Sequence, residues 1–216
     1  MKINIKGTII RNDYKRAYDF FKIENTCPND VSSILESAKG ELVDVYINSG
    51  GGEITSASEI YAMLTAYKNV RIHVVGMAAS AASVIMCAGD CDISPTSMVM
   101  IHNVSSFAVG DYNTMSHESQ VLLTATKAMA AAYVAKTGKS ENDFLKLMNE
   151  EKWFTAKEAV EIGLCDRIAN VPETQLVNAW CTMLTTQQIS EYQNAIQIAK
   201  SKLKLLEVKN HETEIS

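Results

Sequence analysis

The stretch VVGMAASAASVIMCAG, residues 74–89, decides the fold, because it joins a strand to a helix through a run of small side chains. Val74 and Val75 suit a strand, and the apolar residues from Val84 onward suit a buried helix. Ser80 then lies at the first turn of that helix, where unpaired N–H groups and the helix dipole can stabilise an oxyanion. The alternative is a serine that only caps a tightly packed helix, and this segment alone favours that alternative.

A second strand ends in a run of glycines, in VYINSGGGEI at residues 45–54. The exposed amides of residues 50–52 can approach a bound backbone closely, because glycine carries no side chain. The segment lacks the lysine of a P-loop and the spacing of G-x-G-x-x-G, which argues against phosphate binding. A simple turn and the binding of a peptide or acyl oxyanion both remain open.

The third informative segment, SMVMIHN at residues 97–103, ends an apolar strand on a histidine. Such a strand end can aim the imidazole of His102 at a neighbouring site. A serine nucleophile needs a nearby base, and the base needs an orienting acceptor, so Ser, His and a carboxylate at the ends of separate elements are expected. Structural or solvent-exposed roles suit the other histidines better, namely His73, His117 and His211.

Over the first 170 residues, runs rich in Ile and Val alternate with helical segments. This alternation predicts an α/β fold with parallel strand pairing. The strands are expected at residues 2–10, 42–48, 70–75 and 98–101, and the main helices at residues 53–67 and 112–136. Capping-box spacings predict two shorter helices, one after Ser140 with Asp143 and one after Thr155 with Glu158. Gly138 and Gly163 are expected as helix ends.

Composition and charge exclude several classes of function. The 216 residues are 47% hydrophobic and 21% charged, which is close to globular averages and fits one domain with an appendage. A net charge of −5 lacks the basic excess that nucleic-acid binding requires. No apolar stretch approaches the roughly 20 residues of a membrane span, and the start lacks a signal-peptide core. We therefore expect no nucleic-acid or membrane partner and a cytoplasmic location.

The cysteines argue against a disulfide framework or a metal site. They are odd in number and include no C-x-x-C pair, so reduced and mostly buried thiols are expected. The five are Cys27, Cys87, Cys91, Cys165 and Cys181.

Four motifs occur in the order and approximate spacing of the Clp-type serine peptidases, and the chain resembles that family over about residues 2–170. They are YINSGGGEITSASEIYAML, GMAASAASVIMCAG, MVMIHN and WFTAKEAVEIGLCDRI. Within the family, the W-F-T-A-x-E-A pattern is most similar to phage and prophage head-maturation proteases. The resemblance implies a Clp-peptidase and crotonase-type fold of repeated strand-strand-helix units over residues 1–171, followed by a C-terminal helical extension over residues 172–216.

The resemblance also implies roles for individual residues. Ser80 occupies the serine of the family's G-x-A-A-S motif and would be the nucleophile, whereas Ser83 is only a look-alike. His102, in the M-I-H motif, would be the general base. The amides of Gly52 and Ala81, beside Gly51, would form the oxyanion hole.

The expected acid departs from the family pattern. Lining up the T-G-x-S and A-x-E-A-V-E-x-G-L segments with the family places Glu151 where the family usually has Asp, and the extra methylene moves the carboxylate. Glu150 or Asp166 could serve instead. Gly50 also replaces the proline of the usual S-P-G-G, which loosens the turn but keeps the glycine pair.

Beyond Pro172 the sequence changes character. Apolar residues spaced alternately by three and four form a heptad seam of about two and a half repeats. They are Ile189, Tyr192, Ile196, Ala199, Leu203 and Leu206. The seam predicts either a helix that folds back on its own body or an assembly handle, which could recruit a capsid or portal protein, with a frayed end over residues 210–216.

The resemblance implies a serine endopeptidase that needs no metal or cofactor and forms rings of about seven subunits around an enclosed chamber. Scaffold or capsid precursors are the expected polypeptide substrates, in the host cytoplasm or inside a procapsid. The N-terminal segment has no obvious match to the loops that engage an unfoldase, which leaves dependence on an ATPase open. Two alternatives stand: a ring-forming assembly protein that has lost activity, and a crotonase-type acyl-CoA enzyme.

Overall fold

The computed structural model describes residues 1–169, whose strands form one mixed sheet. The order is β2-β1-β3-β4-β5-β8, with β6 branching from β4 and pairing with β7. Every pair in the described residues is parallel except β6 with β7, which is antiparallel. The predicted α/β class and parallel pairing are thereby confirmed. The strands are β1 (Lys2–Ile9), β2 (Asn25–Thr26), β3 (Val43–Gly52), β4 (Val70–Ala79), β5 (Asp90–Ile93), β6 (Met98–Ile101), β7 (Lys152–Thr155) and β8 (Arg167–Ile168).

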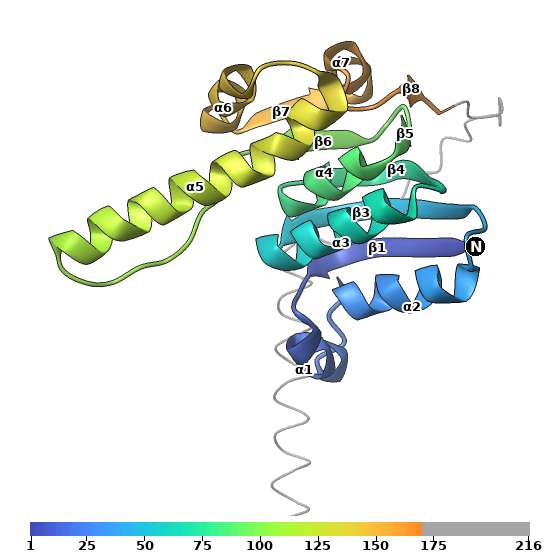
Figure 1. Ribbon diagram of the computed structural model, residues 1–216, viewed down its shortest axis with the longest axis horizontal. Helices are drawn as coiled ribbons and strands as arrows, with labels where there is room; N and C mark the ends of the chain where they lie inside the picture. The colour runs from blue at the N-terminus through green and yellow to red at the C-terminus, as the bar shows by residue number, and fades with distance from the viewer. Residues whose placement is uncertain (170–216) are drawn as a thin grey trace, which may run out of the picture. The chain divides into compact units, whose positions relative to one another are not determined.

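Strand alternation determines which face of the sheet the helices cover. Along β3, Val43, Val45 and Ile47 are fully buried, whereas Asp44 and Tyr46 on the other face are partly exposed. The buried face packs against α2, α3 and α4, and α3 and α4 lie over the central strands (Figure 1). Parallel strands need crossover connections, and these helices supply them. The carboxyl ends of β3, β4 and β6 therefore come together at one edge.

The helix boundaries follow local capping signals. Ser140 accepts a hydrogen bond from the N–H of Asp143, and Thr155 with Glu158 forms a full capping box, so both predicted helix starts are confirmed. Gly138 and Gly163 end α5 and α7 in the left-handed conformation, as expected. The helices are α1 (Lys15–Phe20), α2 (Pro28–Ala38), α3 (Ile54–Tyr67), α4 (Ala81–Ile85), α5 (Tyr112–Thr137), α6 (Glu141–Asn149) and α7 (Ala156–Ile162), with 3-10 turns at Asn12–Tyr14 and Met86–Ala88.

Two strands run further than the sequence predicted. β4 continues from Val75 to Ala79, because residues 77–79 pair with β6. β3 includes the glycines, because Gly51 and Gly52 pair with Thr8 and Ile9 of β1. Glycine and alanine have low strand propensity, so the sequence does not predict these extensions. Hydrogen bonding to the neighbouring strand stabilises them.

Helix α5 is seated on the body only by its C-terminal half. Its buried residues begin at Thr126, whereas Tyr112, Met115, Val121 and Leu123 are exposed. Figure 1 shows the N-terminal half extending beyond the sheet. This overhang, residues 112–123, leaves apolar side chains in solvent.

Some predictions fall outside the described residues: the extension over residues 172–216, its heptad seam, Cys181 and His211. Within residues 1–169, the helices are too short or too polar to cross a membrane. The four cysteines of that region are buried free thiols, as expected. Burial raises the pKa of the Cys87 thiol, and a hydrogen bond with Cys165 together with burial raises that of Cys91. Raised thiol pKa values make these side chains inert.

Candidate active site

Ser80 and His102 meet at the carboxyl edge of the sheet. β4 ends one residue before Ser80, β6 ends one residue before His102, and the two strands are parallel neighbours. Parallel neighbours place their carboxyl ends side by side, and Ser80 Oγ lies 2.8 Å from Nε2 of His102. This is the contact that a serine nucleophile makes with its general base.

The backbone of Ser80 forms a sharp turn that projects the side chain outward. Its dihedral angles, φ 55° and ψ −126°, belong to a region that non-glycine residues rarely adopt. Such a conformation costs about 1–3 kcal/mol and persists only where the surroundings impose it. Here the Ser80 N–H donates to the carbonyl of Met100 at 2.9 Å, which ties the turn to β6. A strained strand-to-helix turn of this kind is how hydrolases expose a nucleophile.

The glycine run packs directly against this turn. A Cβ on Gly51 would lie 2.7 Å from the Ser80 Cβ and 2.9 Å from the Ala81 nitrogen, and a Cβ on Gly52 would lie 2.1 Å from the Ile9 carbonyl. Both glycines are therefore required for close approach, in addition to their positive φ. Ser49 holds the run in place, because its Oγ accepts from the Gly51 N–H at 3.1 Å.

A cavity of about 210 Å³ opens beside the Ser80–His102 pair. Gly52 and Ala81, the residues expected to stabilise an oxyanion, line it next to Ser80. The rest of its wall is mainly apolar and includes Ile54, Val84, Val104, Met129 and Tyr133. A polar reacting centre beside an apolar recess can bind an extended chain and hold one of its side chains.

The expected acid lies across the β-ladder from the histidine. In the antiparallel register Ile101 faces Lys152, so one further step sets Glu151 opposite His102. Glu151 has φ 50° and an exposed side chain. Within residues 1–169, no hydrogen bond joins His102 Nδ1 to a carboxylate. The acid role of Glu151 therefore stays a prediction.

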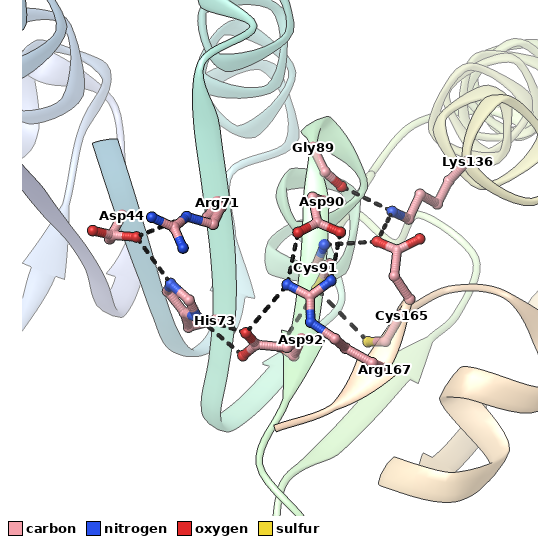
Figure 2. Close-up of polar contacts among 11 residues, drawn as sticks. Asp44, Arg71, His73, Gly89, Asp90, Cys91, Asp92, Lys136, Cys165 and Arg167 are labelled. Atoms are coloured by element: carbon pink, nitrogen blue, oxygen red, sulfur yellow. Dashed lines mark hydrogen bonds and ion pairs between the residues drawn. The ribbon is translucent and has the colours of Figure 1, made fainter. Parts of the chain in front are cut away.

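The two alternative acids differ in their surroundings. Asp166 accepts the Cys91 N–H at 2.7 Å and pairs with Lys136, so its carboxylate is engaged elsewhere. Lys136 and Cys91 appear together in Figure 2. Glu150 caps the end of α6 and is exposed. Of the three carboxylates considered, Glu151 and Glu150 stay as candidates for the acid.

The other described histidines stand apart from the cavity. Nδ1 of His73 lies 2.9 Å from Asp92 and Nε2 lies 3.3 Å from Asp44 (Figure 2), on the sheet face opposite the one that α3 and α4 cover. His117 lines a shallow groove on α5. Within residues 1–169, no three His, Cys, Asp or Glu side chains gather as a metal site.

A protein-family model described as Clp protease matches residues 23–172, which is more than half of the chain. This chain belongs to the Clp protease family. The resemblance carried by the four sequence motifs is thereby confirmed at the level of the family.

Curated Clp protease relatives align over the same region. An ATP-dependent Clp protease proteolytic subunit of Pleurastrum terricola is 33% identical over 129 residues, covering 58% of this chain and 66% of the relative. Proteolytic subunit 2 of Frankia casuarinae is 31% identical over 155 residues, covering 68% and 71%. A subunit of Chlorella vulgaris is 31% identical over 129 residues, covering 58% and 64%. The chain thus spans about two thirds of the length of these relatives.

Sequence reasoning missed Tyr133 at this site. The look-alike Ser83 is fully buried, so it cannot meet a substrate. It instead contacts Tyr133, which lines the cavity from α5. No motif marks Tyr133, and only its place in the Ala-rich C-terminal part of α5 distinguishes it.

Proposed function

We propose that this protein is a serine endopeptidase that hydrolyses peptide bonds at Ser80. The observation that carries the proposal is the 2.8 Å contact between Ser80 Oγ and His102 Nε2, beside Gly52 and Ala81 at the cavity. A crotonase-type acyl-CoA enzyme has no need of such a pair, which disfavours that alternative.

In the proposed reaction, Ser80 Oγ attacks the scissile carbonyl carbon while His102 Nε2 accepts the hydroxyl proton. The carbonyl oxygen becomes an oxyanion, which the N–H groups of Gly52 and Ala81 stabilise. His102 then protonates the leaving amine, and the C–N bond breaks to leave an ester on Ser80. Water, deprotonated by His102, attacks that ester and releases the carboxylic acid product.

Glu151 completes the proposed triad. Its position across the ladder from His102 allows a side-chain rotation to bring the carboxylate to Nδ1, where it would orient the ring and stabilise the imidazolium. The contact is expected to form when substrate occupies the cavity, since catalytic hydrogen bonds often tighten only in the complex.

The substrates are expected to be polypeptides with an apolar side chain near the cleaved bond, because Ile54, Val84 and Met129 line the recess. Scaffold or capsid precursors remain our proposed natural substrates on the basis of the W-F-T-A-K-E-A segment. The proposed assembly is a homo-oligomeric ring, and the exposed apolar residues of the α5 overhang support self-association. The names of the relatives describe them as subunits of an ATP-dependent protease, and we make no proposal about an ATPase partner for this protein.

A fluorophosphonate probe tests the chemistry. The full chain should gain the mass of one phosphonyl group on Ser80, and the Ser80→Ala variant should gain none. His102→Ala should react more slowly by about 10²-fold or more, since it lacks the general base. A folded wild-type protein that never reacts would refute the hydrolase.

One observation favours a second candidate, a ring-forming assembly protein without activity. The described residues show no hydrogen bond from His102 Nδ1 to a carboxylate. Under that alternative the chain would self-associate but would neither label with the probe nor cleave a peptide library.

A further inference from the structure

A series of hydrogen bonds connects Tyr133 of α5 to the backbone of Ser80 through Ser83. Ser83 Oγ lies 2.6 Å from the Ser80 carbonyl oxygen and 2.7 Å from the Tyr133 hydroxyl oxygen. Ser83 is fully buried and Tyr133 is 2% exposed, so water does not replace either contact. Tyr133 belongs to α5, so this chain connects α5 to the backbone of the nucleophile.

The direction of the chain follows from its donors. A carbonyl oxygen can only accept, so the Ser83 hydroxyl uses its single proton on the Ser80 carbonyl. Tyr133 must then donate its own proton to Ser83 Oγ. Burial raises the pKa of the Tyr133 phenol, so it keeps that proton at neutral pH.

The Ser80 carbonyl and the Ala81 N–H are two ends of one planar peptide unit. Because the unit is rigid, fixing the direction of the carbonyl also fixes the opposite direction of the N–H. The Ser83 N–H donates to the same carbonyl at 3.0 Å, which gives the oxygen two donors from one residue. Relaxation of the strained φ of Ser80 would rotate this peptide, and the two donors oppose that rotation.

We propose that Tyr133, acting through Ser83, positions the Ala81 N–H toward the oxyanion and so sets the rate of acylation at Ser80. Tyr133 is then a positioning residue in the proposed peptidase, and the inference rests on that proposed function. Its ring packs against Phe144 of α6, with centroids 5.4 Å apart. The packing of α5 against α6 therefore influences the orientation of the Ala81 N–H through Tyr133 and Ser83.

The test compares fluorophosphonate labelling of the full-length wild type with that of Tyr133→Phe, which keeps the ring and removes the hydroxyl. We expect the maximal labelling rate to fall about tenfold, less than the 10²–10³ of a lost donor, while the half-saturating probe concentration stays unchanged. Ser83→Ala should give a similar loss, and the double variant should lose no more than either single variant.

Tyr67→Phe is the matched control, because its hydroxyl donates to the Glu41 carbonyl at 2.7 Å away from the cavity. Its labelling rate should equal that of the wild type. If Tyr133 only stabilised the fold, Tyr133→Phe would reduce the fraction of molecules that react with the probe. The molecules that do react would label at the wild-type rate. Wild-type rate in Tyr133→Phe, or losses that add in the double variant, would overturn the inference.

Hydrogen–deuterium exchange separates this inference from the proposed function. If the wild type does not label, the peptidase proposal fails, and exchange of residues 78–88 then tests the positioning in the same variants. We expect faster exchange there in Tyr133→Phe and no change in Tyr67→Phe. Equal exchange in all three proteins would overturn the positioning role as well.

Discussion

Gly50 and Gly51 are neighbours in the sequence but differ in what surrounds them. A Cβ on Gly50 would meet only the mobile end of Met77, at 3.6 Å, and Gly50 has no positive φ. A Cβ on Gly51 would collide with the Ser80 turn, and its φ is 98°. The position where the family usually has proline therefore tolerates a side chain, and the next one does not.

This contrast gives a matched pair of variants. Gly50→Ala should keep the wild-type labelling rate and raise the unfolding free energy by about 0.4–1 kcal/mol, because alanine restricts the unfolded chain. Gly51→Ala should slow labelling of Ser80 by about a hundredfold, since it displaces the nucleophile. Urea unfolding and fluorophosphonate kinetics measure the two effects. Equal labelling rates in the two variants would contradict the proposed close packing.

At the scale of elements, the predictable parts of the site are those placed by strand ends. Ser80 and His102 each follow an apolar strand, which the sequence shows, but that they share one site was expected only from the family resemblance. The parallel pairing of β4 and β6 is what brings the two strand ends together. The chain from Ser83 to Tyr133 could not be predicted, because only the packing of α5 on α4 creates it. Short strands such as β8 have too few residues to show alternation.

Glu53, directly after the glycine run, is the N-cap of helix α3, and its side chain accepts hydrogen bonds from the N–H groups of Thr55 and Ser56. Burial opposes ionisation of Glu53, but hydrogen bonds from Ser56 and Thr55 outweigh burial and lower the pKa of Glu53 below its usual value. A lowered folded-state pKa contributes stability above the unfolded value of about 4.3, and that stability is lost as pH falls through the folded value.

Glu53→Gln should therefore destabilise the protein at pH 7, by about 1 kcal/mol, and make little difference near pH 3. Chemical unfolding between pH 3 and pH 7 measures the difference between variant and wild type. Ser58→Ala, at an exposed position of the same helix, is the control and should leave the pH dependence of unfolding unchanged. A difference that does not vary with pH would contradict the capping role.

At the scale of the whole molecule, the α5 overhang leaves several large apolar side chains exposed on one regular element. The side chain of Val121 is 45% exposed and that of Leu123 is 53% exposed, although both are apolar residues of the kind that usually lies in a core. Polar residues such as Ser119 alternate with them. Burial of these side chains against a second copy is the expected contact in the proposed ring.

Val121→Asp and Leu123→Asp together should shift the protein toward smaller species in sedimentation velocity. The fold of the single chain should be retained, because both side chains are already exposed. Ser119→Asp adds a charge to the same stretch at a polar position and should leave the size distribution unchanged. Unaltered sedimentation of the Val121/Leu123 variant would show that the overhang does not carry self-association.

The parallel pairing of β4 and β6 also has a consequence for how the chain acquires reactivity. Parallel strands cannot form as a local hairpin, so Ser80 and His102 meet only after a long-range crossover has closed. Partly folded chains and fragments that lack β6 are then chemically inert. During refolding, the appearance of labelling at Ser80 would time the closure of this crossover, separately from the formation of helices.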